Sequence, residues 1–482
     1  MAGDNLRNRA KKGFVWNIIE RLATNGIHFV ITIVIARLLN PDDYGILAMP
    51  TVFLAIAQVL IDSGFANALI RKTDLNDKDL STAFYFNILV GLASYLILFL
   101  ASPLIADYFN TPILSKLLKV TALVVFINSL GIVQQAIMTK RMDFKTQSVI
   151  STVSTFLSGA LGVWMAYNGF GVWALVSQQI SAALIRIVLL WICGSWKPIL
   201  AWSNESFKYL WAFGSKIVVI GILESIFNNL YSFIIGKKYN ASDLGNYTRA
   251  QQFADLPMSN ISGVVQRVTY PLLSEIQDNN TRLNTIYLRL IDMSSMFVIP
   301  LMVGLAAISS PLIIILLGEK WEGCILMCQI LCVARIWTPF SVINVNLLQV
   351  KGKTGLLLKL DLVKKAVFAI IILLTIYHGI IYLVAGFAFY TFFGYMINTY
   401  YTKKIIGLGF KEQFLEVLPM LSISLTSFIF ALLAITLFSN HYYQLLVGIL
   451  VFVIVTFSLA FLFKRDTIKE VKNYLKKGKK QE

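Results

Sequence analysis

Charged residues are scarce in this sequence, and long loops are absent. Only 14% of its 482 residues are Asp, Glu, Lys or Arg, whereas 57% are hydrophobic. A soluble protein of this length needs more polar surface, so a soluble fold is excluded. The stretches between apolar runs stay under about 20 residues, which leaves little room for a separate catalytic domain. The composition predicts an all-α integral membrane protein.

Histidine and cysteine are scarce as well, which limits metal and nucleophilic chemistry. The three histidines lie far apart, and there is no nucleophile elbow, phosphate-binding loop or metal-binding histidine pair. Cys324, Cys328 and Cys332 share one helical face, but no histidine or carboxylate joins them, so packing is favoured over a metal site. We predict no metal, no cofactor and no catalytic residue. An enzyme with its chemistry in the loops is the less favoured alternative.

Apolar runs of about 20 residues, the length that a helix needs to cross a bilayer core, follow one another along the chain. Fourteen spans are predicted, near residues 14–39, 44–67, 80–106, 113–138, 146–167, 171–192, 207–236, 243–269, 284–317, 323–350, 356–377, 379–402, 413–438 and 442–463. The eighth and tenth carry several polar residues and a proline each. No cleavable signal is expected, because the first run is too long and lacks a cleavage site after it.

The basic residues alternate with the predicted spans. The formal net charge is +17, which could indicate a nucleic-acid partner. However, Lys and Arg cluster in alternate connecting segments, at residues 7–12, 71–78, 140–145, 351–359, 403–411 and 464–480. By the positive-inside rule these segments and both termini are cytoplasmic, and no nucleic-acid partner is predicted. The basic tail is expected to lie on anionic headgroups or, alternatively, to bind a partner.

One segment of the chain recurs two hundred positions later. Residues 35–45 read IARLLNPDDYG and residues 235–245 read IGKKYNASDLG, each between two long apolar runs. Such repeats are typical of transporters, and the even number of spans between the copies gives both halves the same orientation. We predict an N-terminal six-helix lobe at 1–200, a C-terminal six-helix lobe at 201–405, and two further spans with the tail at 406–482.

The first predicted span carries a polar stripe at steps of three and four residues, formed by Asn17, Glu20, Arg21, Thr24, Asn25, His28 and Thr32. With the span starting at Phe14 and a rise of about 1.5 Å per residue, Glu20 and Arg21 lie roughly 10 Å into the membrane. Charges at that depth cost at least about 2.5 kcal/mol unless they are paired or hydrated. A water-filled cavity is therefore favoured over a self-satisfied Glu20–Arg21 pair.

The seventh predicted span repeats this stripe. Moving Thr24 and His28 by two hundred positions leads to Glu224 and Asn228, again one helical turn apart. Spans one and seven are expected to face each other across a central cavity.

Spans two and eight extend the polar lining. Gln58 and Asp62 lie one turn apart in span two, and span eight carries Arg249, Gln252 and Asp255 next to a proline that predicts a kink. Further charges at membrane depth are Arg186, Lys216, Arg289, Asp292 and Arg335. Cations outnumber acids among them, so an anionic substrate such as a phosphate or diphosphate is expected, with arginine as a bidentate donor.

The stretch Ala36-Arg37-Leu38-Leu39-Asn40-Pro41-Asp42-Asp43-Tyr44-Gly45 resembles the signature of bacterial polysaccharide exporters of the Wzx type. The second half agrees in order and spacing, with Gly236-Lys237-Lys238, Leu244-Gly245-Asn246-Tyr247, Leu256-Pro257 and Tyr270-Pro271-Leu272-Leu273-Ser274. The resemblance covers nearly the whole chain and is closest to the colanic-acid and teichuronic-acid exporter branch.

This resemblance implies a V-shaped, MATE-like pair of lobes that alternates between inward-facing and outward-facing states in the bacterial cytoplasmic membrane. The implied substrate is an oligosaccharide repeat unit on a polyprenyl diphosphate carrier, moved from the cytoplasmic to the outer leaflet. Membrane lipids and other polysaccharide assembly proteins are the implied partners. A proton or sodium gradient could supply the energy. The last two spans could hold the lipid tail or merely support a lobe.

The residues yield two sets of candidates. Those for substrate binding are Arg21, Thr24, Asn25, His28, Gln58, Asn228, Arg249, Gln252 and Arg335. Those for ion coupling are Glu20, Asp62, Glu224, Asp255 and Asp292, because burial could raise a carboxyl pKa enough for proton exchange. We expect Glu224, on the repeated stripe, to matter more than Asp292.

Three alternatives remain. The first is a multidrug or other lipid exporter of the same superfamily, although a drug extruder would prefer an acidic or aromatic pocket and the excess of Arg argues against it. A polysaccharide polymerase or ligase would carry a large outer loop. A membrane scaffold without transport would have no reason to keep polar stripes in both halves.

Overall fold

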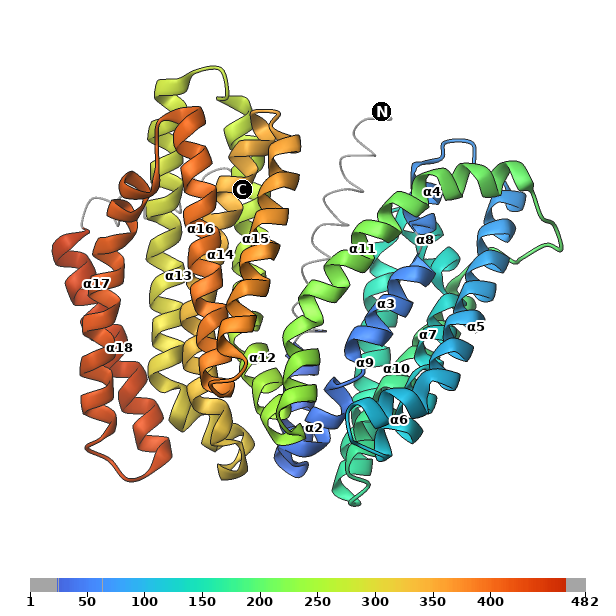
Figure 1. The fold of residues 1–482 in the computed structure, drawn as a ribbon, viewed down its shortest axis with the longest axis horizontal. Coiled ribbons are helices and arrows are strands. Elements are labelled where there is room, and N and C mark those ends of the chain that lie inside the picture. Colours follow the sequence, from blue (N-terminus) through green and yellow to red (C-terminus); the bar gives the residue numbers. More distant parts are fainter. Residues whose placement is uncertain (1–23, 25, 63, 465–482) are drawn as a thin grey trace. The chain divides into compact units, whose positions relative to one another are not determined.

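The computed structural model describes residues 24, 26–62 and 64–464 of the chain. In these residues the regular structure is helical throughout. The contacts divide the chain into two compact units, Met1–Gly245 and Asn246–Glu482. Figure 1 shows the course of the chain from the N-terminal helices in blue to the C-terminal pair in red.

The first unit is built from short and long helices. It contains a helix at Gly26–Leu38, then α2 Pro41–Ala48, α3 Thr51–Asp62, α4 Phe65–Arg71, α5 Asp77–Tyr108, α6 Ile113–Thr121, α7 Leu123–Ser129, α8 Ile132–Lys140, α9 Phe144–Tyr167, α10 Val172–Cys193 and α11 Asn204–Lys238. Helix α12, Ala241–Glu275, starts at the end of this unit and continues into the second.

The second unit holds the longest apolar helices. After α12 it contains α13 Asn280–Leu317, a 3₁₀ turn η1 at Glu319–Trp321, α14 Gly323–Val350, α15 Thr354–Thr375, α16 Ile380–Ile406, α17 Phe410–Ile435 and α18 His441–Phe463. Helix α13 packs on α14, α17 and α18, and α16 packs on α14 and α15. The unit therefore centres on α13 and α14.

Asparagine side chains begin several of these helices. Asn76 accepts a hydrogen bond from the Asp79 backbone N–H at 2.8 Å, and the Asp79 carboxylate accepts one from the Asn76 N–H at 3.1 Å. This capping box satisfies two backbone donors that the first turn of a helix leaves open. Asn240 caps α12 in a similar way, since its side chain accepts from the Asp243 N–H at 2.7 Å. The helix boundaries thus follow local sequence chemistry.

The described residues contain fewer helices that qualify as membrane spans by length and composition than the sequence predicts. Ten described helices are long and apolar enough to cross a membrane, or eleven if α6–α7 and α8, which meet at a bend of 41°, count as one. The predicted total of fourteen is not confirmed. The first predicted span lies partly outside the described residues, while α12 and α15 form as predicted but are too polar to qualify by composition. Polar side chains, rather than missing helices, account for the difference.

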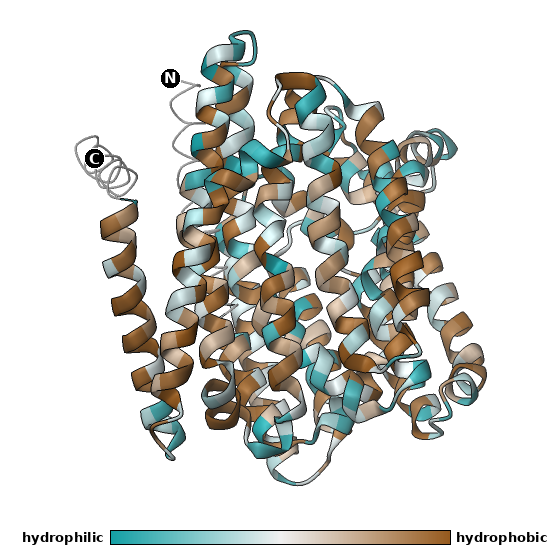
Figure 2. Cartoon of the chain, turned by 60° about the vertical axis from the view of Figure 1, so that its left-hand side comes forward, coloured by the Kyte–Doolittle hydropathy of each residue, from teal (hydrophilic) through white to brown (hydrophobic). Residues whose placement is uncertain are grey.

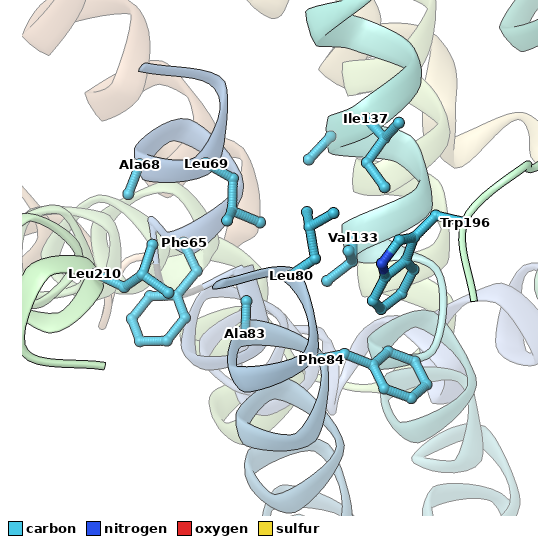
Figure 3. Close-up of a cluster of buried hydrophobic side chains, with 11 residues drawn as sticks. Phe65, Ala68, Leu69, Leu80, Ala83, Phe84, Val133, Ile137, Trp196 and Leu210 are labelled. Carbon is cyan, nitrogen blue, oxygen red and sulfur yellow. The ribbon is translucent and has the colours of Figure 1, made fainter. Parts of the chain in front are cut away.

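An aromatic cluster ties α4, α5 and α8 to the segment that connects α10 with α11. Phe65, Phe84 and Trp196 are buried in it, with Phe84 and Trp196 ring centroids 5.8 Å apart (Figure 3). The connecting segment is also fixed by hydrogen bonds. Ser81 and Thr82 hydroxyls of α5 each accept a backbone N–H from it at 3.0 Å. This part of the first unit is therefore held by both packing and polar contacts.

Helix α11 packs within the first unit. Its Phe233 ring lies 5.6 Å from the Tyr108 ring and 5.5 Å from the Phe109 ring, at the end of α5. A Cβ added to Gly221 would lie 2.8 Å from Val59 of α3, so the two helices approach closely there. The first compact unit therefore includes α11 and extends to residue 245, whereas the sequence predicts a lobe boundary at residue 200. The division into lobes at 1–200 and 201–405 stays a prediction.

The two copies of the repeated segment contact each other through their glycines. A Cβ added to Gly45 would overlap the carbonyl group of Ala241 and lie 2.9 Å from its Cα. A Cβ added to Gly245 would likewise overlap the carbonyl group of Pro41 and lie 3.1 Å from its Cα. Each glycine thus touches the first helical residue of the other copy. Only glycine permits so close an approach of backbone to backbone.

The C-terminal helices α17 and α18 pack on α13. A Cβ added to Gly304 of α13 would lie 2.9 Å from the Phe452 ring of α18, and Gly448 of α18 is as close to Ile435 of α17. Figure 2 shows α18, below the C-terminal label, hydrophobic along most of its length. An apolar groove of about 380 Å³ runs between α13 and α18, lined by Pro300, Gly304 and Phe452 among others.

Candidate functional site

An ion pair joins α12 to α14 in the second unit. Arg335 Nη2 donates to Asp255 Oδ2 at 3.0 Å, and Arg335 Nε donates to Asp255 Oδ1. The guanidinium also lies over the Phe387 ring, 5.1 Å from its centroid. The side chains are 18% and 38% exposed, so the pair is accessible on one side. An anionic ligand would meet the remaining N–H groups of Arg335 or displace Asp255.

A second ion pair joins α13 to the end of α18. The Lys464 ammonium donates to Asp292 Oδ1, and it lies 3.5 Å from the backbone carbonyl of Glu416 in α17. The Asp292 side chain is 11% exposed and that of Lys464 is 10% exposed. This contact fastens the C-terminal helix pair, and it gives Asp292 a structural partner that the sequence did not indicate.

A third ion pair lies within α15. Lys365 Nζ is 2.8 Å from Asp361 Oδ2, one turn earlier in the same helix. The neighbouring Lys364 has no hydrogen bond or ion pair within the described part of the chain, although Asp361 is close enough to interact with it electrostatically. Neither lysine was among the predicted site residues. Their signal in the sequence is two adjacent lysines about 12 Å into a predicted span.

The first unit holds its polar side chains by amide contacts. Gln58 Nε2 donates to Asp62 Oδ1 at 3.1 Å, and Asn128 Nδ2 of α7 donates to Gln58 Oε1 at 3.0 Å. Nearby, Arg186 Nη2 of α10 donates to Gln135 Oε1 of α8 at 2.7 Å. Gln58 and Asp62 thus contact each other one turn apart in α3, while their role in lining a cavity stays a prediction. Asn128 and Gln135 also take part in these polar contacts, and periodicity within single spans could not reveal them.

The polar stripe of the first span is described only in part. Thr24 Oγ1 lies 3.4 Å from Thr152 Oγ1 of α9, and His28 Nδ1 lies 3.5 Å from Thr32 Oγ1. Glu20, Arg21 and Asn25 lie outside the described residues.

The other candidates lie on α11 and α12. Glu224 and Asn228 are exposed on α11, whereas Arg249 and Gln252 are half-buried on α12. The structure thus brings Asp255 to Arg335 and Gln58 to Asp62, and a cavity shared by all candidates stays a prediction.

The cysteines of α14 are buried among packed helices. Cys324, Cys328 and Cys332 have exposures of 0%, 1% and 0%, which agrees with the packing interpretation. Within the described ranges no group of three or more His, Cys, Asp or Glu side chains could hold a metal ion.

The long apolar helices of the described residues are those of a multi-pass membrane protein. Over 94% of this chain and 100% of the other, the structure is similar to that of the lipid II flippase MurJ in its inward closed conformation, with a TM-score of 0.72 at 15% sequence identity. At this identity the likeness shows the fold alone.

The chain belongs to the polysaccharide biosynthesis protein family, whose model matches residues 34–326. It is 26% identical to the lipopolysaccharide biosynthesis protein WzxC of Escherichia coli K12 over 370 residues, which cover 76% of this chain and 74% of that protein. It is 24% identical to the teichuronic acid biosynthesis protein TuaB of Bacillus subtilis 168, with 73% of each chain covered. The resemblance to Wzx-type exporters found in the sequence motifs is therefore confirmed.

Proposed function

We propose that this protein is a flippase that translocates a polyprenyl-diphosphate-linked oligosaccharide across the bacterial cytoplasmic membrane. The cargo would be the repeat unit of a surface or exopolysaccharide, moved from the cytoplasmic to the outer leaflet. The observation that carries the proposal is the combination of family membership with a flippase-like fold. The relatives named for lipopolysaccharide and teichuronic acid biosynthesis support a glycan as cargo.

The proposal extends to mechanism. Alternating access of two lobes would carry the lipid-linked headgroup through a polar passage, while the lipid tail stays in the bilayer. Arginines on the passage, Arg21, Arg249 and Arg335, would contact the diphosphate, because a guanidinium matches phosphate oxygens in a bidentate manner. Asn and Gln side chains would contact the sugars. The topology with both termini in the cytoplasm, ion coupling and the lack of enzymatic activity belong to the same proposal.

Deletion of the gene tests the proposal. Lipid-linked oligosaccharide should accumulate on the cytoplasmic face of the membrane and return to the outer face when the wild-type chain is supplied. Arg249→Ala and Arg335→Ala at equal protein levels should restore display poorly. Lys116→Ala, which removes an exposed cation of α6, is the matched control and should restore it fully. Normal surface glycan without an accumulated intermediate would instead favour export of a drug or another lipid.

A further inference from the structure

Helix α15 carries an unusual density of charge for a helix packed among apolar ones. Within its first three turns it holds Lys359, Asp361, Lys364 and Lys365. Lys364 lies ten residues from the helix start, or about 15 Å along its axis. At such a depth, charged side chains in membrane proteins mark functional sites and require a partner.

Three aspartates in the described part of the second unit each contact a cation other than Lys364. Asp255 is engaged by Arg335, and Asp292 is engaged by Lys464. Asp361 is engaged by Lys365 at 2.8 Å. The Asp361 carboxylate, which already contacts the Lys365 ammonium, also interacts electrostatically with Lys364.

The surroundings of Lys364 lie on α16. Gly394 of α16 leaves the space through which the lysine stem runs, since a Cβ added there would meet only Lys364 Cδ, at 3.9 Å. One turn earlier on α16, the Tyr390 ring packs against Phe368 of α15, with centroids 4.6 Å apart. Because Lys364 and Phe368 share one face of α15, Lys364 and Tyr390 border the same stretch between the two helices. The Phe387 ring beneath Arg335 continues this aromatic lining, 6.1 Å from Tyr390.

We propose that Lys364 is a cargo-binding residue that receives an oxyanion of the transported glycolipid, with Tyr390 beside it. This inference depends on the proposed flippase function. The oxyanion is either a phosphate of the diphosphate link or a carboxylate of an acidic sugar, and an ammonium on a flexible stem binds both. Aromatic rings next to the cation suit the apolar faces of a sugar ring.

The test measures binding of two soluble probes to the full-length protein in lipid nanodiscs. One probe is farnesyl diphosphate, which has the phosphate link without a sugar. The other is a glucuronate-containing oligosaccharide without lipid, compared with a neutral oligosaccharide of the same length. Lys364→Met should lower the affinity for one of the anionic probes about tenfold or more, as expected for loss of a charge-assisted hydrogen bond.

The variants separate binding from folding. Lys364→Arg keeps the charge and should retain most of the affinity, whereas Lys359→Met removes an exposed cation of the same helix and should bind like wild type. If Lys364→Met loses affinity for farnesyl diphosphate, the oxyanion comes from the phosphate link. If it loses affinity for the acidic oligosaccharide alone, the oxyanion is a sugar carboxylate.

Unchanged binding of both probes by Lys364→Met overturns the inference. So does a wild-type protein that binds neither probe while cells carrying it still display the glycan, a result that leaves the flippase function standing. Cells that display the glycan normally after gene deletion would instead contradict the flippase function itself.

Discussion

The two units hold the charged side chains of their helices in different ways. In Asn246–Glu482, the acids Asp255, Asp292 and Asp361 each contact a lysine or arginine. In Met1–Gly245, Asp62 and Arg186 hydrogen-bond to the amides of Gln58 and Gln135 instead.

This difference affects both the stability of the protein and the access of ions or ligands to its charged side chains. An ion pair neutralises both of its members and fixes the helices that carry them, whereas an amide leaves the charge in place. The first unit does contain the ion pair Lys72–Asp79, but it lies at the start of α5. Asp62 and Arg186 are thus held by amides at exposed positions that solvent, an ion or a ligand can reach, whereas Asp292 and Lys464 neutralise each other at nearly buried positions.

Loss of the Asp292–Lys464 pair should have the largest effect. Asp292→Ala leaves the Lys464 ammonium buried without its carboxylate, so the free energy of unfolding should fall by about 3 kcal/mol or more. Thermal unfolding in detergent measures this change. The double variant Asp292→Ala/Lys464→Met should recover much of the loss, and a double variant as unstable as the single one would show that the pair is not the cause.

The exposed pair of the same unit should matter more for transport than for stability. Arg335→Met should lower outer-leaflet display of the glycan about tenfold, the result of losing roughly 1.4 kcal/mol of binding. Its thermal stability should change less than that of Asp292→Ala, since Asp255 is 38% exposed and can be hydrated. If Arg335→Met and Asp292→Ala lose the same stability, the Asp255–Arg335 pair is as structural as the Asp292–Lys464 pair, and the proposed difference between them is wrong.

Glu224 offers a test across the two units. It is exposed on α11 and has no ion pair within the part of the chain that the structure describes. Glu224→Gln should lower export several-fold and make it insensitive to collapse of the proton or sodium gradient, whereas Asp292→Asn should keep that sensitivity when export is normalised to protein level. Full, gradient-sensitive export by Glu224→Gln would remove the idea that the first unit carries ion exchange.

The amide contacts of the first unit should show the smallest effect. Asn128→Leu removes the donor to Gln58 and should destabilise the protein by about 1 kcal/mol, the usual contribution of a neutral hydrogen bond. The matched Val124→Leu substitution, on the same helix α7, tests for a general packing effect. A loss as large as that of Asp292→Ala would mean that the amides bear as much of the stability as the ion pairs.

The sequence predicted most of the helices because their signals are local. Apolar runs, asparagine caps and the repeated segment can all be recognised within short windows. The ion pairs could not be predicted in this way, since Asp255 and Arg335 are 80 residues apart and Asp292 and Lys464 are 172 residues apart. Lys364 was not predicted as a site residue, because the span that carries it shows no polar stripe at helical spacing comparable to those of spans one and seven. The count of spans is not confirmed, because α12 and α15 carry polar groups inside long helices and the first predicted span lies partly outside the described residues.

The contact between the repeated segments has the form of a twofold interface contained in one chain. Gly45 lies on Ala241, and Gly245 lies on Pro41. Residues 45 and 245 are equivalent positions of the two copies, as are residues 41 and 241, so the same contact occurs twice with the copies exchanged. This reciprocity is the rule of isologous dimers, in which residue i contacts j and j contacts i. A side chain at either glycine would overlap the backbone at the first residue of the other copy's helix, so one and the same contact depends on both glycines.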